Sequence, residues 1–344
     1  MSESLLSRLN PFNKSSLAPA LAVVYGLMVL IFSLINPRFF SLENAKAIMA
    51  AVAVSGIVAV GLTPVVLTKN FDMSIGSIFG LSVVVVAKLF NLPGASIPIP
   101  VIILIGLAVG PIIGALNGLL ITRVGINSII VTLGTLAIFR GLTFYWSLKN
   151  ISIPKEAFLI LGRYFVFGFI PLPFIYFLVL LAAGWLLLRY TRAGRNIYLV
   201  GANAYAARLA GLPIRKTQFL PYLISGFLAS LGGVVNAAQV GFANSTFGNG
   251  YEFRILTILV LGGISLNGGR GSLVGVFVAT LIVGSISNGM ALIDVPINWR
   301  DAFIGIILIV SISVDSLQHQ MRARKSSRSP ARSASKRDPI PTKE

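Results

Sequence analysis

The chain has 344 residues, of which 56% are hydrophobic and only 11% are charged. Soluble domains carry about a quarter charged residues, so this composition predicts an integral membrane protein and argues against an ordinary soluble enzyme. The net charge of +18 does not indicate a nucleic-acid partner. The basic residues lie in connecting segments and one tail, and they are not interleaved with aromatic residues.

Residue types that carry chemistry are scarce. The sequence has no Cys, and its single His, His319, lies at the start of the basic tail, where a solvated side chain is expected. The sequence also lacks the G-K-[ST] phosphate loop and the H-E-x-x-H and G-x-S-x-G patterns. We therefore expect no cofactor, no metal and no catalysis by this chain itself.

Apolar segments of about 20 residues are long enough to cross a bilayer. The sequence predicts an all-α membrane protein with about ten transmembrane helices, in two inverted repeats of five. The eighth segment is short and runs into the glycine-rich residues 262–271, so it is expected to be a broken or partial span. The predicted spans are residues 17–35, 47–67, 73–90, 98–122, 128–147, 166–188, 218–240, 253–265, 272–291 and 298–317.

The distribution of basic residues predicts the orientation. With the N-terminus inside, the inner segments hold 19 basic residues and the outer segments hold 8. The positive-inside rule then predicts that both termini are cytoplasmic. The expected division is a cytoplasmic segment at 1–16, a transmembrane domain at 17–317 and a basic, disordered tail at 318–344. The tail is expected either to touch anionic membrane lipid or to be simply solvated.

An internal repeat supports two halves. The pattern S-G-x-x-A begins at Ser55 and again at Ser225, and the pair N-G begins at Asn117 and again at Asn288. The two offsets are nearly equal, and five spans separate the copies. Because five is odd, the halves must face opposite ways, which is typical of transporters whose path runs between the repeats.

The inner loop at 189–217 contains six basic residues and no acidic one. Asn203 is expected to cap a short helix over AYAARLA. Gly211 fits the left-handed position after that helix, and Pro213 prevents its continuation. This loop is therefore predicted to dock a cytoplasmic partner.

Few ionisable residues fall within the spans. Asp72 precedes the third span and is interpreted as a structural cap, with Ser74 beside it. No span centre carries Asp or Glu, which disfavours an ion-coupled carrier. Arg140 lies inside the fifth span. Pairing with a backbone carbonyl and a contact with the path both remain open for it.

Four segments resemble one known family. Residues 191–235, beginning TRAGRNIYLVGANAYAARLAGLPI, are similar to the central region of the permease subunits of bacterial ATP-binding cassette importers for monosaccharides, the ribose-type family. Residues 248–275, GNGYEFRILTILVLGGISLNGGRGSLVG, and 115–141, ALNGLLITRVGINSIIVTLGTLAIFRG, also match. TKNFDMSIGS at 68–77 matches as well, although Lys and Asn replace the family's glycine pair.

The resemblance implies a function and several partners. Such permeases lie in the bacterial inner membrane and pair with a second copy or a paralogue. They receive their solute from a periplasmic sugar-binding protein, and cytoplasmic ABC ATPase subunits drive them. Tyr205 stands where the family's coupling motif has an acidic residue. The coupling residues that the resemblance implies are Arg195, Gly201, Asn203, Ala206, Ala207, Arg208, Gly211 and Pro213.

Polar and aromatic residues of the spans are candidates for the translocation path. Such side chains can contact a sugar, or they can simply hydrogen-bond neighbouring helices. The outer loop at 241–254 either faces the binding protein or is an ordinary connection. The candidate path residues are Asn117, Thr132, Thr135, Phe139 and Asn288.

Two other functions remain open at this stage. The first is an ATP-independent facilitator or secondary carrier for a small polar solute. The second is a membrane scaffold or receptor that docks a cytoplasmic partner without transport. Both lack the energy coupling that the inner loop and the family resemblance indicate.

Overall fold

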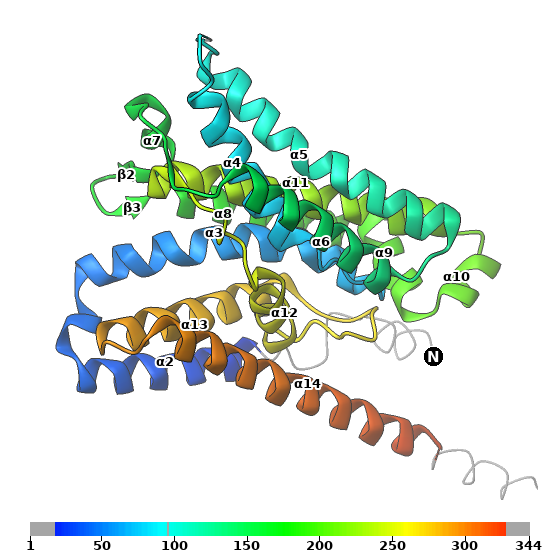
Figure 1. Ribbon diagram of the computed structural model, residues 1–344. Helices are drawn as coiled ribbons and strands as arrows, with labels where there is room; N and C mark the ends of the chain where they lie inside the picture. The colour runs from blue at the N-terminus through cyan, green and yellow to red at the C-terminus, as the bar shows by residue number, and fades with distance from the viewer. Residues whose placement is uncertain (1–17, 95, 328–344) are drawn as a thin grey trace, which may run out of the picture.

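Two long helices, α3 (Leu42–Leu67) and α11 (Ile214–Val240), pack against each other at the centre of the molecule (Figure 1). The computed structural model describes residues 18–94 and 96–327. The remaining long helices surround the central pair. They are α2 (Ala18–Ile35), α4 (Ile75–Phe90), α5 (Ile99–Leu119), α6 (Ser128–Trp146), α8 (Leu172–Tyr190), α12 (Tyr251–Leu261), α13 (Leu273–Leu292) and α14 (Ile297–Ser327).

Short elements complete the fold. The four short strands form two antiparallel pairs, β1 with β4 and β2 with β3. The short elements are η1 (Pro37–Phe40), η2 (Leu120–Val124), α7 (Glu156–Arg163), α9 (Arg192–Ala202), α10 (Ala204–Leu209), β1 (Ile151–Ser152), β2 (Phe165–Val166), β3 (Ile170–Pro171) and β4 (Phe242–Ala243).

The helix pairings repeat between the two halves of the chain. Helix α11 packs on α5 and α4, and in the same way α3 packs on α13 and α12. Helix α4 packs on α6, as α12 packs on α14. The first helix of each half departs from the pattern, because α2 packs on α13 while α8 packs on α3. These pairings agree with the repeat read from the sequence.

Glycines set the closest helix approach, between α5 and α11. A Cβ added at Gly110 would overlap the carbonyl oxygen of Gly226, and a Cβ at Gly226 would overlap that of Gly110. Small residues let membrane helices approach this closely and gain van der Waals contact. The glycine of the second S-G-x-x-A copy is therefore needed for packing.

A helix lies within each of the ten predicted segments, and six helices are long and apolar enough to cross a membrane. The short eighth segment is confirmed, since α12 has 11 residues and ends at Leu261, where the glycine-rich turn begins. The six apolar helices are Leu42–Leu67, Ile99–Val124, Ser128–Trp146, Leu172–Tyr190, Ile214–Val240 and Leu273–Leu292.

Two predicted boundaries are wrong. The sixth span was expected to begin at residue 166, but residues 165–171 form the β2–β3 hairpin and α8 begins at Leu172. Gly168 and Pro171 favour a turn and a stop there over a helix. Helix α14 continues to Ser327, so the backbone of 318–327 is helical instead of disordered. The segment 1–16 and the tail beyond 327 lie outside the described residues.

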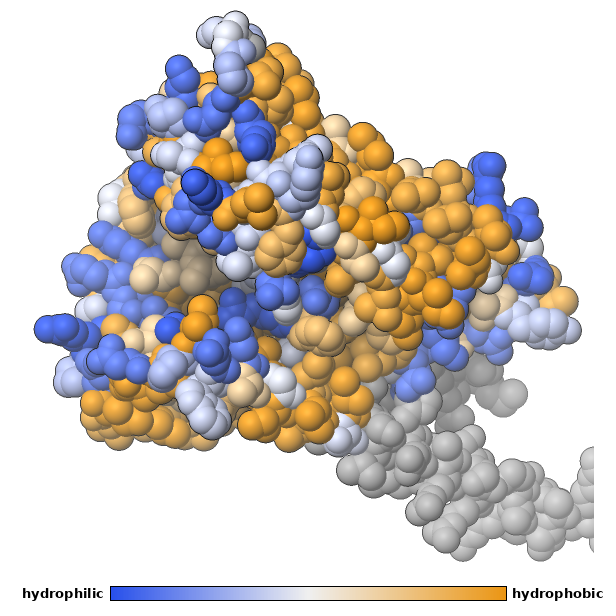
Figure 2. Space-filling model, viewed as in Figure 1, coloured by the Kyte–Doolittle hydropathy of each residue, from blue (hydrophilic) through white to orange (hydrophobic). Residues whose placement is uncertain are grey.

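The visible surface is divided by polarity. Figure 2 shows hydrophobic residues over α5 and α6 in the middle of this face. Hydrophilic residues gather at the end that carries α9 and α10, and also around a hollow near the opposite end, below α7. An apolar middle between two polar ends is the pattern expected of a protein that spans a bilayer.

Candidate coupling region and translocation path

The loop between α8 and α11 folds into two helices, α9 and α10. The Thr191 hydroxyl accepts a hydrogen bond from the Gly194 backbone at 3.0 Å and caps α9. The Asn203 side chain accepts one from the Ala206 backbone at 3.0 Å and caps α10. Gly211 has φ +76° after α10. The predicted short helix and both of its end signals are therefore present.

Helix α9 was not predicted from the sequence. Its signal was a threonine N-cap at 191, followed by apolar residues at Ile197, Val200 and Gly201, where a helix places them on one face. These three residues are buried, whereas Arg195 is exposed. The many basic residues of this segment favoured its interpretation as a loop.

Helix α9 packs on the ends of two elements from different halves of the chain. The Gly269 backbone N–H donates to the Leu67 carbonyl at 2.9 Å, which joins the end of α3 to the turn before α13. Gly201 lies against this junction, because a Cβ added there would overlap the Leu67 oxygen and lie 2.7 Å from the Gly269 nitrogen. Helix α9 therefore contacts both halves of the chain at this junction.

A tyrosine strengthens the same junction. The Tyr198 hydroxyl donates to the Gly271 carbonyl at 3.0 Å. Burial raises the pKa of Tyr198 to about 12. The hydroxyl is therefore protonated, and able to donate, throughout the physiological pH range.

Helix α10 projects from the end of the bundle and is visible at the right of Figure 1. Tyr205 and Leu209 are each 73% exposed, and their four-residue spacing puts them on one face. Arg208 is also exposed, whereas Ala207 is buried. This arrangement presents two large apolar side chains and one positive charge to a partner.

Of the other residues predicted for coupling, Ala206, Pro213 and Asn203 are exposed around α10, as is Gly211. Tyr205 was considered only as a departure from the family pattern, and Leu209 was not predicted to take part in coupling. The spacing of these two residues on a capped helix was the signal that would have found them.

A cavity of about 320 Å³ lies where α9 meets α10 and faces the turn between α3 and α4. Lys69 lines it together with Gly201 and Asn203. Lys69 has φ +64°, a left-handed conformation that costs a non-glycine residue about 1 kcal/mol. This is the position where the resembling family has a glycine, which adopts that conformation without strain.

Asp72 joins three helices through hydrogen bonds. Its Oδ1 accepts from the backbone and hydroxyl of Ser74 at 3.1 and 2.5 Å. Its Oδ2 accepts from the Ser225 hydroxyl of α11 at 2.8 Å. Asn117 of α5 donates to the Ser74 hydroxyl at 2.9 Å. Asp72 thus orders the residues before α4, and it also ties α4 to the central helix of the other half.

Replacing Asp72 by alanine is expected to lower the free energy of unfolding by about 2 kcal/mol, because it leaves the buried Ser74 amide and Ser225 hydroxyl without their acceptor. The loss is measured by denaturation of the purified protein in detergent. Asp301→Ala provides the control, since Asp301 is exposed on α14. It is expected to change the stability by less than about 0.5 kcal/mol. Equal losses in the two variants would contradict the role of the Asp72 network.

Arg140 of α6 binds the backbone that precedes α12. Its guanidinium donates to the Phe247 and Gly248 carbonyls at 2.8 and 2.6 Å. The carboxylate of Glu252 lies close by, because a Cβ added at Gly76 would meet both the Glu252 carboxylate and the Arg140 guanidinium. Of the two interpretations left open by the sequence, carbonyl pairing is therefore observed.

The predicted path residues are not gathered at one point. The hydroxyls of Thr132 and Thr135 donate to carbonyls of their own helix, and Phe139 packs against the hydrophobic core. Asn117 and Asn288 belong to α5 and α13, which lie in different layers of the bundle (Figure 1). Within the described part of the chain, the side-chain oxygen of Asn288 has no hydrogen-bond partner.

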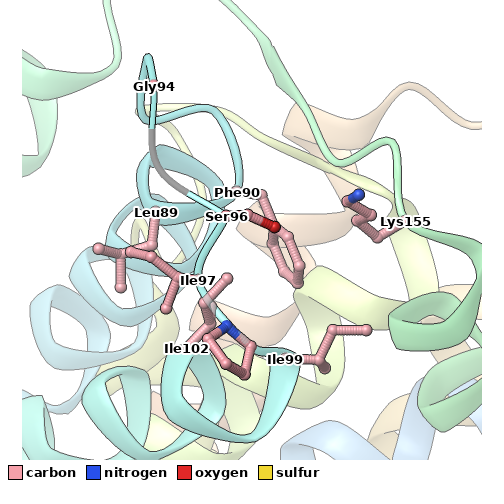
Figure 3. A pocket seen from close by; sticks show the side chains of 9 residues that line it. Leu89, Phe90, Gly94, Ser96, Ile97, Ile99, Ile102 and Lys155 are labelled. Atoms are coloured by element: carbon pink, nitrogen blue, oxygen red, sulfur yellow. The ribbon is translucent and has the colours of Figure 1, made fainter.

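A further cavity lies elsewhere. It measures about 530 Å³ and sits at the connection between α4 and α5, with mostly apolar lining and Lys155 at one side (Figure 3). None of the predicted path residues lines it. Its place at the ends of two helices makes it a surface depression separate from the interior of the bundle.

Comparison with known proteins identifies the family. The family model described as "Branched-chain amino acid transport system / permease component" matches residues 44–312. The chain belongs to this permease family. It is therefore a transport component and not an enzyme, and it is a multi-pass protein of the bacterial inner membrane.

The permease has curated relatives that match over nearly their whole length. The autoinducer 2 import system permease protein LsrC of Klebsiella pneumoniae is 36% identical, and the match covers 89% of this chain and 88% of that protein. The ribose import permease protein RbsC of Escherichia coli K12 is 33% identical, covering 84% and 91%. A solved metal-chelate type ABC transporter in an inward-facing conformation aligns with a TM-score of 0.46 at 17% identity, covering 86% of this chain and 99% of that one.

Proposed function

We propose that this chain is the membrane-spanning subunit of an ATP-driven importer for a monosaccharide or a similar small polar solute. The observation that carries the proposal is α9, which joins the ends of both halves while α10 projects beside it. The relatives named as ribose and autoinducer 2 import permeases support the class of solute. Cytoplasmic ATPase subunits would supply the energy, and a periplasmic binding protein would deliver the solute.

The proposed topology has ten spans in two inverted repeats, with both termini in the cytoplasm. The repeated helix pairings support the two halves. Figure 1 supports the orientation, because α10 and the end of α14 lie at one end of the bundle, whereas α7 and the β2–β3 hairpin lie at the other. The excess of basic residues in the α10 loop supports a cytoplasmic position for that end.

The proposed coupling surface consists of α10 and its flanks, including Arg195. Tyr205 and Leu209 would fill an apolar groove on the ATPase, and Arg208 would pair with an acidic side chain at its rim. Large anchors of this kind carry most of the energy of protein interfaces. The partner's movement would then pass through Gly201 to both halves and alternate their access.

The proposed path runs between the halves of one chain and alongside a second permease, which is either a second copy or a paralogue. The hydrophilic hollow opposite the α10 end is the proposed outer mouth (Figure 2). Among the candidate residues, Asn117 and Asn288 each have a buried side-chain oxygen without a hydrogen-bond partner in the described part of the chain, and these oxygens would accept from a solute hydroxyl once the path opens. Thr132, Thr135 and Phe139 would shape the path walls, because their hydroxyls or ring are already engaged.

Arg208→Glu tests the coupling surface. In proteoliposomes with the ATPase and binding protein, the rate of binding-protein-stimulated ATP hydrolysis is expected to be at least about tenfold lower in this variant than in the wild type. The reason is that like charges would repel across the interface. Its thermal stability is expected to be unchanged, since Arg208 is exposed. The matched control is Lys149→Glu, an equally exposed charge reversal at the opposite end.

Two outcomes would contradict the proposed function. Unchanged hydrolysis and uptake in Arg208→Glu would remove α10 from the coupling surface. Solute uptake by this chain alone in liposomes, without ATPase, would favour a facilitator or secondary carrier. Docking of the partner without any solute movement would favour a scaffold or receptor.

A further inference from the structure

The β2–β3 hairpin carries an unusual tip. Phe167 and Gly168 occupy the turn with φ +51° and +77°, so both residues are left-handed. Left-handed positions in tight turns favour Gly, Asn or Asp, because a bulky side chain is disfavoured there. Phe167 is nonetheless 88% exposed. The chain therefore holds a large apolar side chain outward in a conformation that it does not favour.

The whole hairpin is aromatic on its outer surface. Tyr164, Phe165 and Phe169 join Phe167 as exposed large side chains. Residues 157–171 contain no acidic residue and one basic residue, Arg163. An exposed apolar surface of this kind indicates contact with another protein or with a membrane.

The base of the hairpin is fixed to the bundle. Its strands pair in register, Val166 opposite Ile170, and the Leu172 backbone donates to the Tyr164 carbonyl at 2.9 Å. The ammonium of Lys46 lies 5.6 Å from the centroid of the Phe165 ring. Arg163 donates to two carbonyls at the end of α11. The tip therefore projects from a rigid support at the edge of the molecule (Figure 1).

The position of α8 indicates what covers the hairpin. Helix α8 begins at Leu172, directly after β3, and few residues of its apolar stretch are buried within the bundle. The hairpin thus lies where a lipid-facing span enters the bilayer. Aromatic rings concentrate at that level, where an apolar body and a polar surrounding are both accommodated.

We propose that residues 164–171 insert their aromatic side chains into the headgroup region of the leaflet opposite α10. The hairpin directly precedes α8, which is long and apolar enough to cross a membrane and is mostly not buried within the bundle, and this favours lipid over a soluble partner. Lys46 and Arg163 place positive charge at the hairpin base, where lipid phosphates lie. The hairpin then acts as a fixed anchor that sets the depth of α8 and of the adjoining α3.

The absence of Cys from the chain makes a depth measurement direct. Phe167→Cys in the full-length protein is labelled with a nitroxide and reconstituted in phosphatidylethanolamine–phosphatidylglycerol vesicles. Two matched reference sites are Lys149→Cys, exposed at the same end, and Val179→Cys, exposed midway along α8. Collision rates with oxygen and with a water-soluble nickel chelate are measured for each label.

The label at 167 is expected to collide with the nickel chelate at least fivefold less often than the label at 149. It is expected to collide with oxygen more often than the label at 149 and less often than the one at 179. Phe169→Cys supplies a second reporter, with the same expected direction, should the tip variant fold poorly. Solute uptake is expected to continue in these variants, so that the result is independent of the proposed transport function.

Three results would contradict the proposal that the hairpin is a membrane anchor. The first is a nickel collision rate at 167 equal to that at 149. The second is spin–spin broadening that disappears on dilution with unlabelled protein, which would place a second copy over the hairpin. The third is an aqueous label that becomes shielded only when a soluble binding protein is added.

Discussion

Gly201→Ala is expected to abolish solute uptake and the stimulation of ATP hydrolysis by the binding protein. A Cβ at this position would overlap the Leu67 carbonyl and approach the Gly269 nitrogen to 2.7 Å. Both are backbone atoms, so no flexible side chain can move aside. Overpacking of this kind costs about 1–3 kcal/mol, and here it would push α9 away from both halves. Uptake and hydrolysis are measured in proteoliposomes with the partner subunits.

Gly134→Ala is the matched control for this experiment. An added Cβ at Gly134 of α6 meets nothing within 4 Å, so this variant is expected to behave like the wild type. The thermal unfolding of both variants separates loss of coupling from loss of folding. A folded Gly201→Ala protein with normal stimulated hydrolysis would show that α9 need not touch the junction during transport.

Arg140→Met is expected to give the largest loss of stability among the single substitutions considered. It removes both donors to the Phe247 and Gly248 carbonyls and leaves the largely buried Glu252 carboxylate without its nearby positive charge. Hydrogen bonds to charged groups contribute about 1.5–3 kcal/mol, so the expected loss is about 3 kcal/mol. Unfolding in detergent, followed by intrinsic fluorescence, measures this loss.

A double variant tests the cause of the loss. Glu252→Gln removes the charge that Arg140→Met leaves uncompensated, so the double variant is expected to lose less stability than the two single variants together. Arg123→Met is the control, because Arg123 is exposed on η2. Strict additivity of the two substitutions would show that Arg140 acts on the loop carbonyls alone and not on the carboxylate.

The positions of the helices could be predicted because they depend on local properties. Runs of apolar residues located helices in all ten predicted segments, and the glycine-rich segment explained the short α12. Asn203 and Gly211 located α10 for the same reason, since capping and left-handed turns involve only neighbouring residues. Boundaries were less accurate where an apolar run continued into another structure, as in the β2–β3 hairpin.

The candidate site was less predictable because its contacts join distant residues. Asp72 was expected to cap one helix, yet its second oxygen accepts from Ser225, 153 positions away. For the threonines of α6 the sequence left a sugar contact and a hydrogen bond within the helical bundle open, and their hydroxyls donate to carbonyls of their own helix. Side-chain direction and packing partner, which decide these roles, cannot be read from composition or periodicity.

The sequence by itself determined the class of the protein, its helical segments, the basic loop and the internal repeat, because hydropathy, charge and spacing act locally or statistically along the chain. Only the tertiary structure decided that α9 bridges the ends of α3 and the turn before α13, and that Arg140 holds the loop before α12. It also placed an aromatic hairpin at the start of α8. These features depend on close approaches between segments far apart in sequence, and such approaches exist only once the helices pack.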